Sequence, residues 1–262
     1  MTWETIELGR AASEFGIFDY ATGMAPNTHP DVVWPPGGPS RLRIALHRGD
    51  LVLPDLAFET TGFVAPEADM LIVDGDLTIE GDLDVEQFDV GTPGYLLVKG
   101  HLRARSLLFA RQFELLVWGD VTATEAILGE DLAGGSFRCA GTVSAPMTVL
   151  ADFRLSAGAA TGTVLAQRVP GESAAGSVTL RDAGAARIRT VEIDEAYGEF
   201  WLLELPEGVT QDDLETPDDF AAHAVLTGAA LAEYEGSGGP LSIKQVIRKL
   251  GAGAFQPRLL GA

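Results

Sequence analysis

Six carboxylates crowd into one short stretch of this chain, and they are the residues whose type and spacing could do chemistry. They are Asp74, Asp76, Glu80, Asp82, Asp84 and Glu86. Carboxylate oxygens suit Ca²⁺ or Mg²⁺, and a pair of carboxylates can hydrolyse a glycosidic bond. The stretch has neither the glycine–aspartate repeat of calcium-binding β-rolls nor an EF-hand loop. We therefore expect no metal site, and we interpret these acids as solvent-facing side chains.

The other reactive side chains do not form a catalytic set. His29, His47, His101 and His223 are scattered without metal-ligand spacing, and Cys139 occupies a position that suits a small buried side chain. Aromatic residues, which stack on sugars, are only 8% of the chain. The nucleophile elbow, the phosphate-binding loop and the dinucleotide fingerprint are missing from the sequence. We expect no enzymatic activity and no cofactor.

The charge of the chain is strong and unevenly distributed. With 38 acidic and 18 basic residues, the formal net charge is −20. Gly49 to Val98 holds twelve acids and Thr190 to Ile243 holds thirteen, and neither segment contains a lysine or arginine. Such a field repels nucleic acid and anionic lipid and attracts basic proteins, although solubility alone also favours a high net charge. A basic protein is the partner that this charge favours.

The segments that must position these residues follow one short pattern. An apolar residue stands four and two places before a glycine, and again two and four places after it. The pattern recurs around Gly75, Gly100, Gly119 and Gly141. A period of roughly 20 residues is typical of a solenoid, whose coils stack because none can bury its own apolar face. The shared glycine marks a corner where no Cβ fits.

The fold class follows from this repeat. Period-2 alternation and frequent turn residues over 42–205 predict a mainly β protein, a right-handed parallel β-helix (β-solenoid). Residues 1–41 are expected to be an irregular segment, with a Pro- and Gly-rich loop at 25–40 that covers one end of the solenoid. A leucine-rich repeat is disfavoured because the repeat lacks the turn asparagine and has no helical segments.

Residues 206–262 are predicted to form a helical appendage. Thr216–Asp219 is typical of a helix start, and this helix would continue towards Gly236, where a Gly- and Pro-rich break follows. A second helix, Ile243–Leu250, would be capped by Ser242 and end at Gly251. Its basic residues could dock it on the solenoid's own acidic face or on that of a neighbouring subunit. They are Lys244, Arg248 and Lys249.

Trp118 is predicted to point outward, in register with Asp74, Lys99 and Ala140. An outward tryptophan can anchor a protein interface. It can equally pack beneath a terminal helix, which needs an apolar surface to lie on, and this second interpretation is favoured.

The segments LIVDGDLTIEGDLDV, LLVKGHLRARSLL and LLVWGDVTATEAIL resemble bactofilin-like, polymer-forming cytoskeletal β-helix proteins, over about residues 68–153. That resemblance implies end-to-end polymerisation through exposed terminal coils, which appendages at both ends of this chain would obstruct. It is similar in particular to a divergent group that accompanies bacterial toxins, and this likeness implies a toxin-neutralising role.

Two functions follow as expectations. The first is a non-enzymatic acidic β-solenoid that binds a basic protein, in the form of a toxin-neutralising immunity protein. The alternative is a bactofilin-like scaffold that binds copies of itself. A single cysteine, the lack of a signal-like start and the lack of a long apolar run predict a cytoplasmic protein without a membrane partner. The expected partner-binding residues are Asp74, Asp76, Asp82, Asp84 and Trp118.

Overall fold

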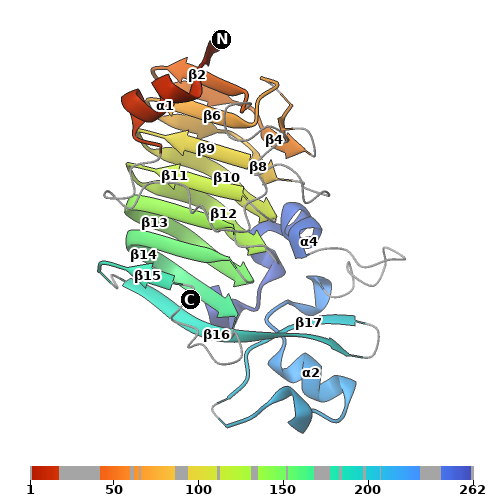
Figure 1. Cartoon of the computed structure of the whole chain (residues 1–262). Helices are drawn as coiled ribbons and strands as arrows, with labels where there is room; N and C mark the ends of the chain where they lie inside the picture. The colour runs from red at the N-terminus through yellow and green to blue at the C-terminus, as the bar shows by residue number, and fades with distance from the viewer. Residues whose placement is uncertain are drawn as a thin grey trace.

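The predicted parallel β-solenoid is confirmed by the computed structural model, which is mainly β with few helices (Figure 1). The coils stack along one axis, from the N-terminal residues at one end to β16 near the other. The structure describes residues 2–17, 42–59, 62–64, 66–85, 94–110, 113–130, 135–151, 153–167, 178–182, 185–196, 199–206, 208–230 and 243–260.

The solenoid has three faces, each made of parallel strands from successive coils. The first face contains β2 (Ile44–Arg48), β6 (Met70–Asp74), β9 (Gly94–Val98), β11 (Phe113–Val117), the first parts of β13 (Ser136–Ala151) and β14 (Arg154–Gln167), and β15 (Val178–Leu180).

The second and third faces share their longer strands. The second face contains β3 (Leu51–Leu53), β7 (Leu77–Ile79) and the first parts of β10 (Leu102–Ala110) and β12 (Val121–Glu130), followed by the middle of β13 and β14. The third face contains β4 (Leu56–Glu59), β8 (Asp82–Val85), the later parts of β10, β12, β13 and β14, and β16 (Ala185–Ala196).

The interior is built by the alternation that the sequence shows. Residues equivalent in successive coils stack on one another, so that Val73, Val98, Val117 and Cys139 form one buried row. Phenylalanines line another part of the core, where the rings of Phe109 and Phe153 stack with centroids 5.6 Å apart. Burial of apolar surface on this scale is the main stabilising term of the fold.

The predicted glycine corner is confirmed. Gly75, Gly100, Gly119 and Gly141 stack through backbone hydrogen bonds, with N–O distances of 2.9 to 3.1 Å between successive glycines. A Cβ on Gly119 would lie 2.5 Å from the carbonyl oxygen of Gly100, closer than real Cβ contacts come. Because the obstacle is backbone, a larger residue would force two coils apart.

The N-terminal segment closes one end of the stack. β1 (Glu4–Ile6) pairs antiparallel with β2, and β5 (Gly62–Phe63) pairs antiparallel with β4, so two of the three strands of the first coil, β2 and β4, are paired on their outer edges. α1 (Leu8–Phe15) lies on the first face and buries Phe15 against its outward apolar residues. The segment is thus less irregular than predicted, and its Pro- and Gly-rich stretch lies outside the described residues.

The C-terminal region leaves the stack as a hairpin. Parallel pairing in β16 ends at Val191, and the rest of β16 pairs antiparallel with β17 (Glu199–Leu203). α2 (Pro217–His223) begins at the predicted cap, where Thr216 and Asp219 form a capping box. It ends earlier than predicted, because Ala224 pairs with Leu203 in an extended conformation. A short 3-10 helix, η4 (Gln211–Asp213), precedes it.

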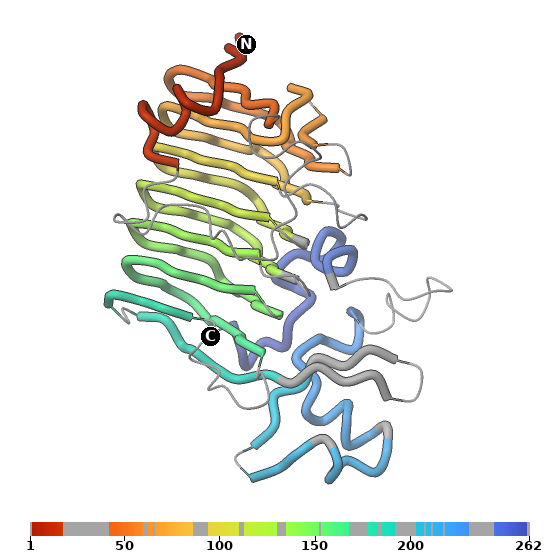
Figure 2. The backbone as a smooth tube through the Cα atoms, in the orientation of Figure 1, coloured from red at the N-terminus to blue at the C-terminus, as the bar shows by residue number. Residues whose placement is uncertain are grey.

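The last described segment returns to the solenoid. It contains α4 (Ile243–Leu250), the 3-10 helix η5 (Gly251–Ala254) and α5 (Pro257–Leu260), and Figure 2 shows it in blue beside the middle coils. The predicted bounds of α4 are confirmed, and Gly251 ends it with φ of 56°. The predicted break and the Ser242 cap lie outside the described residues. The segment covers the third face by packing on its outward apolar side chains.

Candidate functional site

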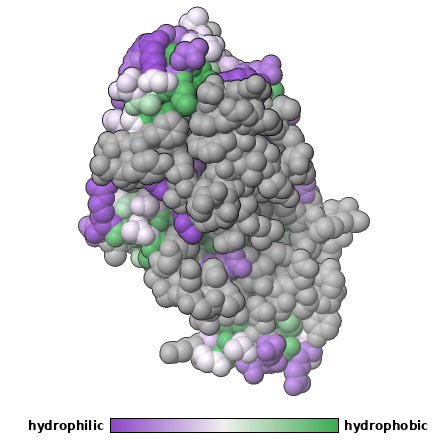
Figure 3. Space-filling view, in the orientation of Figure 1, coloured by the Kyte–Doolittle hydropathy of each residue, from purple (hydrophilic) through white to green (hydrophobic). Residues whose placement is uncertain are grey.

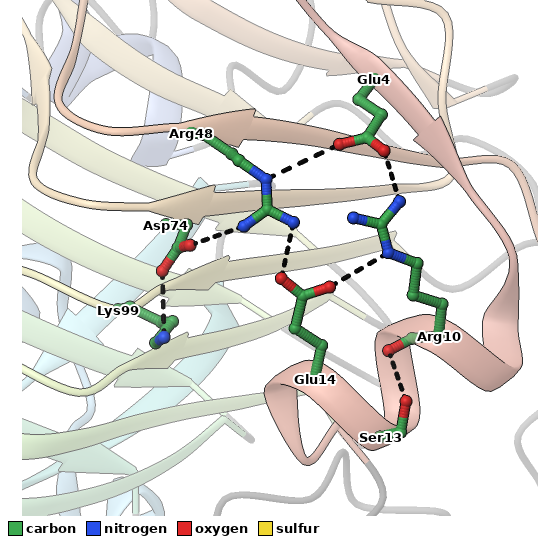
Figure 4. A network of polar contacts seen from close by, with 7 residues as sticks. All are labelled: Glu4, Arg10, Ser13, Glu14, Arg48, Asp74 and Lys99. Atoms are coloured by element: carbon green, nitrogen blue, oxygen red, sulfur yellow. Dashed lines mark hydrogen bonds and ion pairs between the residues drawn. The ribbon is translucent and has the colours of Figure 1, made fainter.

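Asp74 lies in a network of ion pairs that fastens α1 to the first coils (Figure 4). Its carboxylate pairs with Arg48 at 3.1 Å and with Lys99 at 2.9 Å. Arg48 also pairs with Glu14 of α1 at 2.5 Å, and this hydrogen bond lowers the pKa of the Glu14 carboxyl from its ordinary value. Arg10 joins the network through Glu4 and Glu14. Asp74 is therefore engaged with the chain's own cations.

Asp82 is buried although its strand position points outward. Arg105 from the next coil covers it with two hydrogen bonds, at 3.0 Å from Nε and 2.6 Å from Nη2. The bonded carboxylate raises the pKa of the Arg105 guanidinium. Asp82 is only 5% exposed. The expectation of a solvent-facing side chain is therefore wrong for this residue, because sequence alternation does not show which outward positions another side chain covers.

Asp84 holds the C-terminal segment. It forms ion pairs with Lys244 and Arg248 of α4. Lys244 is 5% exposed, and its ammonium also donates to the carbonyl oxygen of Val85 at 2.6 Å. α4 therefore docks on the acidic face of its own solenoid, one of the two arrangements that the sequence left open. Asp84 is half-buried beneath it and is not a free partner-binding residue.

Asp76 belongs to a ladder of side chains that follow the corner glycines. Its Oδ1 accepts the backbone N–H of His101 at 2.7 Å, and its own N–H donates to Asp50 at 2.9 Å. The ladder continues as Asp120 N–H donates to His101 Nδ1 at 3.0 Å and Thr142 N–H donates to Asp120 at 2.8 Å. The carboxylate of Asp76 remains exposed to solvent.

Trp118 is 41% exposed and continues the outward row of Asp74 and Lys99. The ammonium of Lys99 lies 5.6 Å from the centre of its indole ring and 5.5 Å from that of Phe15. The favoured position beneath a C-terminal helix is wrong, because α4 and α5 pack on the third face. The sequence could not show which outward surface the C-terminal segment would choose.

A group of exposed carboxylates lies on the second face, at its first two coils. Within the described part of the chain, no lysine or arginine forms an ion pair with any of them. They stand at the two ends of β3 and β7, which are in register, and Val52 between them is 63% exposed. We call this group with Val52 the acidic patch. Its carboxylates are Asp50, Asp55, Asp76 and Glu80.

The acidic patch was only partly foreseen from the sequence. Asp76 was among the expected binding residues, Glu80 was interpreted as a surface acid, and Asp50 and Asp55 were not singled out. The recurring Gly-Asp pair, as at Gly49-Asp50 and Gly75-Asp76, is the signal that could have placed Asp50 beside Asp76. Asp55 carries no such signal, and its carboxylate accepts the N–H of Asp82 at 3.1 Å.

A second concentration of acids lies at the opposite end of the molecule. Around α2, exposed Asp212, Asp213 and Asp218 stand close together in sequence. The hydrogen bonds from Thr210 lower the pKa of the Asp213 carboxyl, and those from Thr216 lower that of Asp219. On the side seen in Figure 3, hydrophilic residues gather at the N-terminal end and again near α2.

Two kinds of reactive group can be examined among the described residues, namely clusters of metal-ligating side chains and the single cysteine. No three His, Cys, Asp or Glu side chains among them are placed to hold a metal ion. Cys139 is buried, its thiol donates to the carbonyl oxygen of Gly119 at 3.2 Å, and burial raises its pKa to about 11. A thiol with that pKa is a poor nucleophile at neutral pH. None of the described helices has the length and apolar character to cross a membrane.

Comparison with known proteins returned no protein-family model, curated protein or solved structure that matches this chain.

Proposed function

We propose that this protein is a non-enzymatic β-solenoid that binds a basic protein partner through the acidic patch. One observation carries the proposal. The chain's own helices cover outward apolar residues of the first and third faces. The second face exposes Val52 among four carboxylates that have no ion-pair partner within the described ranges. Of the residues expected from the sequence, Asp76 remains in this surface.

The arrangement of the acidic patch suits protein recognition. Protein interfaces place an apolar centre inside a polar rim, and Val52 between the carboxylates has this form on a small scale. A net charge of −20 would also accelerate encounter with a basic protein at low salt. The toxin-neutralising role, and with it a cytoplasmic location, is the form of this function that the resemblance to the divergent bactofilin-like group implies.

The test compares two variants with the same change of charge and apolar surface. The patch variant carries Val52→Lys and Glu80→Lys, neither of which removes a described hydrogen bond or ion pair. The control carries Val64→Lys, at a valine 56% exposed, and Asp212→Lys near α2. Each immobilised protein is offered a cell extract at roughly 50 and 200 mM salt. Retained proteins are identified by mass spectrometry.

Wild type and control are expected to retain the same basic protein at the lower salt concentration, and the patch variant is expected to lose it. Retention should fall as salt rises, because the carboxylates act through charge. Equal retention by the patch variant and the control would contradict the proposal, provided that the melting temperatures of all three proteins agree.

A second candidate function is self-assembly through the other end of the solenoid. Ile188 is in register with the interior residue Val164, yet it is 45% exposed. Leu180 and Ala186 beside it are only partly buried. Among the described strands, β15 pairs with β14 alone. These features favour the bactofilin-like scaffold, in which terminal coils of two copies meet.

Sedimentation at increasing protein concentration tests self-assembly. Wild type should form larger species as concentration rises, and Ile188→Asp should abolish them, because a charge would then lie in the contact. Electron microscopy would show filaments if both ends engage. Removal of residues 2–17 would increase assembly on this account, since β1 and α1 close the N-terminal end. A strictly monomeric truncated protein argues decisively against the scaffold.

A further inference from the structure

The C-terminal segment of residues 243–260, which we call the strap, joins coils that are not neighbours. Its α4 is held by Asp84 of β8, Glu125 of β12 accepts the N–H of Ala252 at 2.9 Å, and Thr163 of β14 donates to the carbonyl oxygen of Leu259. The strap thus runs along the third face in the direction of the stack. In a solenoid each coil otherwise contacts only its neighbours.

The surface beneath the strap is a row of apolar side chains that lies outside the solenoid interior. Leu108, Leu128, Val149 and Leu165 are in register on successive coils and point away from the interior cluster. The strap covers this row with its own apolar side chains. Those are Val246, Ile247, Ala254, Phe255 and Leu259.

Ion pairs hold the strap at both of its ends. At its start, Lys244 and Arg248 meet Asp84. Near its end, Arg258 pairs with Glu204 at 2.5 Å, and Glu204 also holds Arg189 of β16 at 2.6 Å.

We infer that the third face is an interaction surface for the strap of a second copy of this chain, so that two copies can exchange straps. The strap's contacts on the coils are with residues far away in sequence, as for Lys244 and Val85, which are 159 residues apart. None of these contacts requires the strap and the coils to belong to one chain. A second copy presents the same apolar row, the same Asp84 and the same Glu204, and no new surface has to be formed.

The joining sequence, residues 231–242, includes Gly236-Ser-Gly-Gly-Pro240, from which a break between two helices was predicted. Exchange of an identical element between protomers is a low-cost route to a dimer, because the contacts made are those already present in the monomer. The strap exchange is independent of the acidic patch and of the open end at Ile188, so either can fail without affecting it.

The test uses two full-length variants with opposite charge changes. One carries Asp84→Lys, and the other carries Lys244→Glu with Arg248→Glu. Each alone brings like charges together where α4 docks. In a mixture, the acidic strap of the second variant can bind the altered coils of the first. Native mass spectrometry distinguishes the two chains by mass, and we expect heterodimers to exceed homodimers by at least about tenfold, the ratio that about 1.4 kcal/mol of pairing free energy gives.

A chain with all three substitutions is the control, because it restores opposite charges within one molecule. It should remain a monomer and melt near the wild-type temperature. If the control is stable and the mixture stays monomeric, or if both variants form homodimers equally, strap exchange is overturned. Should the single variants fail to fold, tagged and untagged wild type are mixed at high concentration. Co-capture of the untagged chain that persists when both chains carry Ile188→Asp supports exchange, and its absence overturns it.

Discussion

The carboxylates of the first two coils fall into two groups that the amino-acid sequence does not separate. Asp74, Asp82 and Asp84 are each bonded to an arginine or lysine from another coil or helix. Asp50 directly precedes β3 and Glu80 directly follows β7 in the same coils, and neither has a cationic partner among the described residues. Neighbouring coils supply the cations for Asp74 and Asp82, and α4 supplies those for Asp84. Among the described residues, no such cation forms an ion pair with the acidic patch.

This contrast teaches that an acidic stretch can serve two purposes at once. One group joins coils to one another and holds the ends of the chain on the solenoid, and the other remains available to a partner. Substitutions in the first group should therefore change stability and leave binding at the acidic patch intact. Substitutions at exposed, unbonded positions of the patch should do the reverse.

The largest effect is expected from Asp84→Ala. It removes one carboxylate from Lys244, which is 5% exposed and keeps its bond to the Val85 carbonyl oxygen. Breaking a buried ion pair costs about 3–5 kcal/mol, and we expect the lower end of that range. Urea unfolding measures the change, and Glu80→Ala is the control at less than about 0.5 kcal/mol. Equal losses for the two variants would show that the strap is not held by Asp84.

A smaller effect is expected from Asp82→Ala. Arg105 is half exposed, so it can turn towards water when its carboxylate is removed, and only the buried hydrogen bonds are lost. We expect a loss of about 1–2 kcal/mol in the free energy of unfolding. Arg105→Ala should cost more than Asp82→Ala, because it strands a buried carboxylate. If urea unfolding shows a larger loss for Asp82→Ala than for Arg105→Ala, burial of the Asp82 carboxylate does not determine the cost.

Asp76→Ala tests the ladder that borders the acidic patch. The exposed carboxylate accepts one backbone N–H, from His101, and its loss is expected to cost about 0.5–1 kcal/mol. Asp76→Asn keeps an oxygen acceptor and removes the charge. It should therefore retain most of the stability while weakening capture of a basic partner. If Asp76→Asn and Asp76→Ala melt at the same temperature, the hydrogen bond does not contribute.

Much of the fold could be predicted from the sequence because the rules involved are local. Alternation placed Val98 and Val117 inside, and both are fully buried. The corner glycines were recognised because stacked coils leave no space for a Cβ at Gly119. The end of α4 followed from Gly251, whose φ of 56° a residue with a side chain rarely adopts.

The failures come from contacts between distant parts of the chain. Alternation shows that Asp82 and Asp84 point outward, yet it cannot show that Arg105 and α4 cover them. The predicted helix through Val225 was overridden because Ala224 and Leu226 pair with Leu203 and Phe255. Trp118 was assigned to the wrong neighbour for the same reason. Contacts of this kind decide which acids of the candidate site are free and which are bonded. The sequence could therefore not predict that distinction.

The smallest expected effect concerns pH and the network that fastens α1. The hydrogen bond from Arg48 holds the pKa of the Glu14 carboxyl below its ordinary value of 4.5. A carboxyl whose pKa is lower in the folded state contributes stability above its unfolded pKa, and this contribution disappears as pH falls through the folded pKa. Glu14→Gln should therefore melt below wild type at pH 6, and the two should converge below pH 4.5.

The control for this pH dependence is Glu7→Gln, one residue before α1, where the exposed carboxyl has no described ion pair and does not cap the helix. Its melting temperature should follow that of wild type across the whole pH range. Because Glu4 and Asp74 belong to the same network, only the difference between each variant and wild type is interpreted. A gap between Glu14→Gln and wild type that persists unchanged into acid would mean that packing of Phe15, rather than the ion pair with Arg48, holds α1 on the first face.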